Sequence, residues 1–143
     1  PLLAGELSLR PGEPELPIKG GLPKNIKTRA DRMLADGDRV GSLMSIAMPG
    51  HPPGSMAFYV PHSHVLIAGD ALRARGGLSV AGDLRISFPF PALATWSKAL
   101  ALESARKIQK LPVKVLLTGH GKALVSPAKA LDEAIRRIEE KGA

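Results

Sequence analysis

Three residues whose side chains can bind a metal ion occur in one recurring sequence context. His51 follows an apolar run in MPGHPPGS, Asp70 ends a second run in IAGD, and His120 follows a third run in LLTGHG. A glycine stands next to each of them, and glycine lets the backbone turn sharply and approach other groups closely. Two imidazoles and one carboxylate are a suitable ligand set for Zn²⁺, Fe or Mn. If the three strands are neighbours with suitable directions, the pattern predicts a metal site at one edge of a sheet.

Each of these residues also has a simpler interpretation when it is taken alone. A single histidine in a turn is commonly solvated or bonded to a backbone carbonyl, and GD after a strand is commonly only a turn. GHG can equally be a tight turn whose histidine caps the next segment. The metal-site hypothesis therefore depends on convergence in space, and it fails if the three side chains face away from a shared site.

Two further histidines, His62 and His64 in PHSHV, have the spacing of a metal-binding pair. They lie in the turn before the strand that ends at Asp70. A strand from His64 to Gly69 would separate them from Asp70 by about 17 Å, at ~3.3 Å per residue. We therefore predict that both are exposed turn residues at the opposite end of the sheet.

The segment after Asp70 is predicted to be a loop over residues 71–91, and loops of that length are usually functional. It follows the candidate ligand directly, so it could form one wall of a pocket. Arginines there could clamp a carboxylate or phosphate, and nearby aromatic side chains could line the pocket, although surface and core positions are the simpler interpretation. These residues are Arg73, Arg75 and Arg85, and Phe88, Phe90 and Trp96.

The elements that must position the candidate ligands follow from the apolar pattern. Residues 43–47, 56–60 and 64–69 have the pattern of strands, and the short turns between them predict an antiparallel meander. A helix is predicted over residues 95–111 with Thr95 as its N-cap, and a buried strand over 113–117. A second helix is predicted over 126–142, with Ser126 as N-cap and an apolar stripe at i, i+3, i+4, i+7. This order predicts an α/β (α+β) fold with a mixed, mostly antiparallel sheet and helices on one face.

Composition limits the classes of function. The chain has 143 residues, 44% hydrophobic and 23% charged, which is typical of one globular domain with a core. It contains no cysteine, so disulfides and thiolate metal sites are excluded. No apolar run reaches the ~18 residues of a membrane span, and the first residues lack a signal-peptide pattern, so we expect a cytoplasmic protein without a membrane partner.

The net charge of +7 raises the question of nucleic acid as a partner. The 20 Lys and Arg residues are scattered along the chain, and only 3 Phe, 1 Tyr and 1 Trp are present. A single-strand binder usually combines a basic groove with stacking aromatic residues. A basic, solvated surface is therefore the expected explanation, and nucleic acid is not the expected partner.

The series MPGHPPGSMAFYV, HVLIAGD and VLLTGHG resembles the C-terminal half of the metallo-β-lactamase superfamily, in its small metallo-hydrolase branch, over roughly residues 34–142. The resemblance implies half of an αββα sandwich. It also implies that His51, Asp70 and His120 are metal ligands and catalytic residues. His51 would bind a first metal, Asp70 would bridge two metals, and His120 would bind the second. The implied cofactor is a pair of divalent metal ions, zinc first, with iron or manganese as alternatives.

One part of the family pattern is missing. The HxHxDH motif that supplies the family's other ligands does not occur in this sequence. We therefore expect residues 1–37 to be a loop-rich connecting segment and residues 38–143 to be the C-terminal half of the domain. Such a half exposes one apolar face of its sheet, so the expected partner is its own N-terminal half or a second copy of the chain.

The expected function is that of a metal-dependent hydrolase acting on a small-molecule substrate. A metal-activated water would attack an ester, thioester, lactone, amide or phosphodiester. The chain alone lacks half of the ligands, so we expect it to be an inactive and largely metal-free fragment. Two alternatives stay open: a non-catalytic remnant kept for binding or dimerisation, and a nuclease-like member of the same superfamily.

Overall fold

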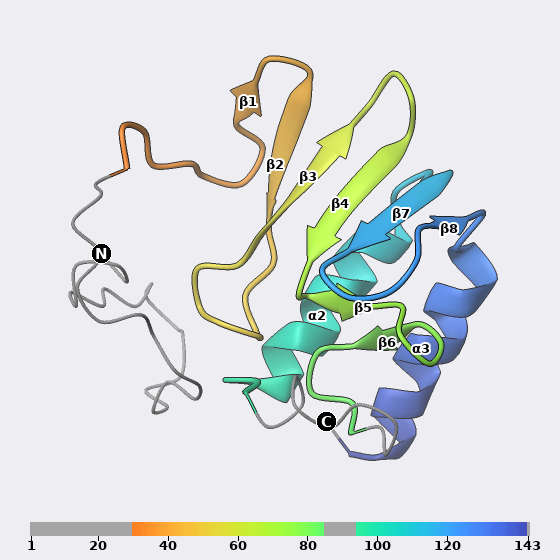
Figure 1. Cartoon of the computed structure of the whole chain (residues 1–143). Coiled ribbons are helices and arrows are strands. Elements are labelled where there is room, and N and C mark those ends of the chain that lie inside the picture. Colours follow the sequence, from red (N-terminus) through yellow and green to blue (C-terminus); the bar gives the residue numbers. More distant parts are fainter. Residues whose placement is uncertain (1–29, 85–93, 143) are drawn as a thin grey trace.

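The computed structural model describes residues 30–84 and 94–142 of the chain (Figure 1). These residues form two sheets and two helices. The strands are β1 (Arg39–Val40), β2 (Leu43–Ala47), β3 (Met56–Val60), β4 (Val65–Gly69), β5 (Leu72–Arg73), β6 (Ser79–Val80), β7 (Val115–Thr118) and β8 (Leu124–Val125), and the helices are α2 (Lys98–Gln109) and α3 (Ala128–Glu140).

The larger sheet has six strands in the order β1-β2-β3-β4-β7-β8. β2, β3 and β4 form an antiparallel meander, and β7 joins β4 in parallel, with Leu66 opposite Leu116. A parallel pair needs a long crossover, and α2 provides it between β4 and β7. The predicted mixed, mostly antiparallel sheet is therefore confirmed. In Figure 1, α2 passes behind the sheet, and α3 packs against α2.

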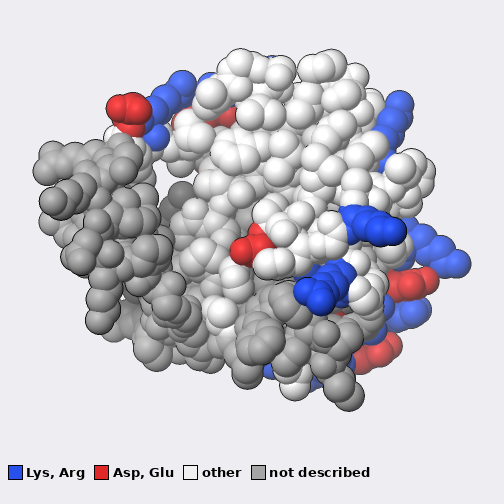
Figure 2. All heavy atoms as spheres, in the orientation of Figure 1, with Lys and Arg blue, Asp and Glu red and all other residues white. Residues whose placement is uncertain are grey.

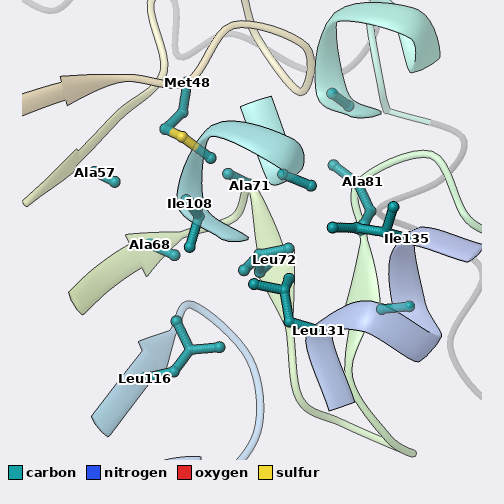
Figure 3. Close-up of a cluster of buried hydrophobic side chains, with 14 of the residues drawn as sticks. Met48, Ala57, Ala68, Ala71, Leu72, Ala81, Ile108, Leu116, Leu131 and Ile135 are labelled. Atoms are coloured by element: carbon teal, nitrogen blue, oxygen red, sulfur yellow. The ribbon is translucent and has the colours of Figure 1, made fainter. Parts of the chain in front are cut away.

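The hydrophobic core lies between the sheet and the two helices (Figure 3). Alternate strand residues point into it because successive side chains of a strand face opposite sides of the sheet. The sheet contributes Ala57, Tyr59, Leu66, Ala68 and Leu116, and the helices contribute Ala101, Ala105, Ile108, Leu131, Ala134, Ile135 and Ile138. The apolar stripe predicted for the last helix is confirmed, since all four of its residues are buried.

The other side of the large sheet, which we call the open face, carries apolar side chains, and neither of the two described helices covers it. The strand register places them in two rows, which are Phe58, Ile67 and Leu117, and Val60, Val65, Val115 and Val125. Ile67 is 39% exposed and Val125 is 77% exposed, and the other five are half-buried. Figure 2 shows that lysine, arginine, aspartate and glutamate lie mostly around the border of this face.

Several predicted elements differ from the structure. The predicted loop over 71–91 is wrong for residues 72–80, which form the β5–β6 hairpin. This hairpin forms because Leu72 and Val80 pair and are fully buried, with β6 against α2 and α3. Residues 85–93, with Arg85, Phe88 and Phe90, lie outside the described residues. β8 was not predicted, because two residues are too few for a detectable period.

Both helix starts also differ from the prediction by one or two residues. α2 begins after Ser97, whose side chain accepts a hydrogen bond from the Leu100 amide, so Thr95 is not the N-cap. α3 begins after Pro127, and Ser126 precedes it with a φ of 51°. Among the described residues, neither helix is long and apolar enough to cross a membrane.

Candidate metal centre

The sheet topology brings the three candidate ligands to one edge. β2, β4 and β7 run in the same direction, and His51, Asp70 and His120 follow the C-terminal ends of these three strands. The topology therefore places the three residues at one edge of the sheet, which the metal-site hypothesis requires. Asp70 and His120 come closest, since Oδ1 of Asp70 lies 3.5 Å from Nε2 of His120.

The position of Asp70 beside His120 depends on a glycine. The Gly119 amide donates a hydrogen bond to the Gly69 carbonyl at 2.9 Å, which continues the β4–β7 pairing beyond the strands. A Cβ on Gly119 would lie 2.0 Å from Oδ1 of Asp70, a distance at which atoms overlap. Only glycine lets the Asp70 carboxylate occupy this position next to His120.

The His51 turn is fixed against the start of α2. The Trp96 amide donates to the His51 carbonyl and the Ser97 amide to the Gly50 carbonyl, each at 2.9 Å. Gly50 has a φ of 140°, and a Cβ there would lie 2.4 Å from the backbone nitrogen of Ala101, so this close approach requires glycine. Nδ1 of His51 lies 3.3 Å from the Thr95 hydroxyl. The prolines and glycines of this turn therefore place a half-buried imidazole at a defined position.

The three candidate ligands interact electrostatically. Burial lowers the pKa of His51 below its ordinary value of 6.5, because burial disfavours the charged imidazolium. The Asp70 carboxylate opposes this shift by raising the pKa of His51, and His120 lowers it further. His51 therefore favours the neutral form, which is the form of imidazole that binds metals.

This shift predicts a pH dependence of stability for the metal-free chain. In the unfolded protein His51 has the ordinary pKa of 6.5, and in the folded protein its pKa is lower. The unfolded state then binds more protons between the two values, so the stability that neutral His51 contributes is lost as pH falls below about 6.5. We expect the urea concentration at the unfolding midpoint, measured with EDTA, to decrease when the pH is lowered from about 7.5 to about 5.5. The His51→Gln variant should show a smaller fall, and an equal fall in both proteins would contradict the assignment.

The donors that the structure brings together fit part of a metal-binding shell. Their chemistry is suitable, since two imidazoles and a carboxylate are ordinary ligands of zinc, iron and manganese. Within residues 30–84 and 94–142, however, no three His, Asp or Glu side chains lie close enough to hold one ion by themselves. Within these residues, the Asp70–His120 pair and His51 therefore do not form a complete metal site.

The second histidine pair lies at the other end of the sheet, as predicted. His62 and His64 belong to the turn between β3 and β4, which is the edge opposite Asp70. His62 is exposed, but the prediction of exposure is wrong for His64, which is half-buried. The reason is a hydrogen bond between Nδ1 of His64 and the Tyr59 hydroxyl at 2.7 Å.

The proposed substrate clamp is wrong for one of the arginines. Arg73 is only 2% exposed, and its guanidinium donates to the Ser79 hydroxyl at 2.7 Å and to the Asp83 carbonyl at 2.5 Å. It therefore holds the β5–β6 hairpin together. Arg75 is exposed, while Trp96 is buried beside the His51 turn and belongs to the support of that turn.

Comparison with known proteins agrees with this geometry. The family model described as "Metallo-beta-lactamase superfamily" matches residues 2–120, a range that includes all three candidate ligands. The protein YobT of Bacillus subtilis (strain 168), described as uncharacterized, is 46% identical over 139 residues, which are 97% of this chain and 60% of YobT. The probable metallo-hydrolase YflN of the same organism is 38% identical over 82 residues, which are 54% of this chain and 31% of YflN.

A solved structure shows the same arrangement of elements. The crystal structure of TTHA1623 in a di-iron-bound form has a TM-score of 0.54 and 26% identity, and the similarity covers 72% of this chain and 47% of that chain. This chain thus spans 60% or less of the length of each of these relatives. The extent of the family match, together with the shared fold, shows that the chain belongs to the metallo-β-lactamase superfamily.

Proposed function

We propose that this chain supplies one half of a dinuclear metallo-hydrolase site. In this proposal His51 would hold the first metal, His120 would hold the second, and Asp70 would be a ligand of both. The observation that carries the proposal is the 3.5 Å approach of Asp70 to His120, at the sheet edge to which the His51 turn is also fixed. The di-iron form of TTHA1623 and the description of YflN as a probable metallo-hydrolase support it. We expect zinc as the metal, with iron or manganese as alternatives.

The residues of this chain would bind and orient the reactants. Divalent metals held by such ligands lower the pKa of a water molecule and polarise the bond that is cleaved. The side chains of Asp70 and His120 are 47% and 44% exposed, so both can be reached by water and substrate. The Asp70 carboxylate can accept a hydrogen bond from the attacking water and orient it. The bond cleaved would be that of an ester, thioester, lactone, amide or phosphodiester in a small molecule.

The remaining donors would come from the segment that covers the open face. This face carries two apolar rows and ends at the edge where the candidate ligands lie. A face of this kind is normally packed against a second layer. Because this chain corresponds to 60% of YobT, the remaining part of such a protein is long enough to form that layer. We therefore propose that the chain functions as part of a longer polypeptide, rather than as a homodimer.

A complementation experiment tests both proposals. The segment of YobT outside the match would be produced as a separate polypeptide and mixed with this chain. We expect the chain alone to bind little zinc and to be inactive. The mixture should form a complex on gel filtration, retain close to two zinc ions per complex after dialysis, and hydrolyse at least one member of a panel covering the five bond classes.

The Asp70→Asn variant is the matched control. Asp70 lies beyond β4 and outside the two apolar rows, so the variant should still form the complex but should lose zinc and turnover. A wild-type complex that forms but binds no zinc would rule out the metal-site proposal. Two zinc ions and turnover in the chain alone would contradict the need for a second segment.

A further inference from the structure

Thr95 lies next to the His51 ring although 44 positions separate the two residues in the sequence. Its hydroxyl is 3.3 Å from Nδ1 of His51. The residue is only 3% exposed, and it stands just before the two amides, of Trp96 and Ser97, that bind the backbone of the His51 turn. Backbone and side-chain contacts from one short segment therefore act on the same turn.

The surrounding contacts hold both partners in place. The Ser104 hydroxyl donates to the Pro49 carbonyl at 2.7 Å, which ties the start of the turn to the body of α2. The methyl group of Thr95 lies 3.2 Å from the point where a Cβ on Gly82 would be, so the side chain is packed on that side as well. Threonine is stiff at χ1, and such packing fixes the direction of its hydroxyl. The His51 ring thus faces a preformed hydrogen-bonding group.

A neutral imidazole has one protonated and one unprotonated nitrogen, and only the unprotonated nitrogen can bind a metal. The hydrogen bond made by the other nitrogen sets which tautomer is present. We propose that Thr95 is a positioning residue, whose hydroxyl accepts a hydrogen bond from Nδ1–H of His51 and so presents Nε2 to the metal. The reference to a metal rests on the proposed function, whereas the choice of tautomer does not.

The tautomer can be measured on the metal-free chain. Long-range ¹H–¹⁵N NMR at a pH where the ring is neutral distinguishes a protonated from an unprotonated ring nitrogen. We expect wild-type His51 to have a protonated Nδ1 and an unprotonated Nε2. Thr95→Val keeps the shape but removes the acceptor, so the Nδ1 signal should move toward that of a mixture of tautomers. Thr95→Ser keeps the hydroxyl and should restore the wild-type signals.

Ser97→Ala is the matched control for a purely structural effect. It removes the N-cap of α2 two residues from Thr95 and should lower the urea midpoint, while the nitrogen signals of His51 stay as in the wild type. In the complex with the YobT segment, Thr95→Val should weaken zinc binding by about 10- to 100-fold, and Thr95→Ser should restore it.

The outcomes separate this inference from the proposed function. An unprotonated Nδ1 in the wild type would overturn the role of Thr95, and this result needs no variant to fold. Unchanged His51 signals in Thr95→Val would overturn it as well. If the wild-type complex binds no zinc but the signals change as expected, the proposed function fails and the tautomer assignment stands.

Discussion

Asp83→Asn is expected to lower the free energy of unfolding by about 3 kcal/mol. The Asp83 side chain is completely buried, and its carboxylate lies 2.6 Å from the Lys141 ammonium and 3.8 Å from Nε of Arg137. Removing one partner of a buried ion pair leaves the opposite charge uncompensated, which costs about 3–5 kcal/mol. The lower end applies because Lys141 is half exposed and can turn to solvent.

The measurement is the urea midpoint, and Asp132→Asn is the control. Asp132 undergoes the same change of charge, but it is exposed and accepts a hydrogen bond from Gln109 on the surface. The free energy of unfolding of Asp132→Asn should differ from that of the wild type by no more than about 0.5 kcal/mol. Equal losses in the two variants would show that Asp83 contributes no more than a surface carboxylate. Because a domain of this size has a total stability of about 5–15 kcal/mol, the expected difference is readily measured.

The sequence was sufficient to predict the three strands that precede His51, Asp70 and His120. Each of these strands is a mostly apolar run of four or five residues that ends at a glycine or within three residues of one, and such runs have a detectable pattern. The parallel pairing of β4 with β7 was consistent with the helix between them, which provides the crossover. The exact approach of Asp70 to His120 was not predictable, because it depends on the register between two strands that are distant in the sequence.

The β5–β6 hairpin could not be predicted from periodicity. Its strands have two residues each, which is too short for an alternating pattern, and glycines and polar residues surround them. The burial of Arg73 and Asp83 could not be predicted either, because charged residues in a glycine-rich segment normally indicate a surface loop. Asp83 pairs with Arg137 of α3 and with Lys141 just after it, whereas Arg73 donates to Ser79 and to the Asp83 carbonyl.

The role of Thr95 was missed for a related reason. Threonine before an apolar helical pattern is a typical N-cap, and this interpretation explains the residue without any contact to His51. Ser97, two positions later, is an equally good N-cap and is the one that the structure uses. A serine or threonine that lies near a helix start but is not the N-cap can therefore indicate a contact with a ligand residue elsewhere in the chain.

Gly119→Ala is expected to disrupt the proposed metal site while leaving the fold nearly unchanged. The new Cβ would lie 2.0 Å from Oδ1 and 3.1 Å from Cγ of Asp70, so the carboxylate must rotate away from His120. This rotation is open to it because the side chain is 47% exposed. Loss of a residue that supports a ligand typically weakens metal binding by about 10- to 100-fold, and displacement of a ligand should weaken it by at least as much. Zinc titration of the complex with the YobT segment measures this effect.

Gly121→Ala, two residues further on, serves as the control. It should reduce stability more than zinc affinity, whereas Gly119→Ala should reduce zinc affinity more than stability. Gly121 has a φ of 109°, and a Cβ there would lie 2.5 Å from backbone atoms of Ala74 and Arg75. Backbone cannot turn aside as a carboxylate can, so this variant should lower the urea midpoint clearly, whereas Gly119→Ala should shift it little. If Gly119→Ala binds zinc as tightly as the wild type, Asp70 does not hold a metal at the position where the structure places it. A loss of stability without a loss of zinc affinity would instead assign Gly119 a role in folding only.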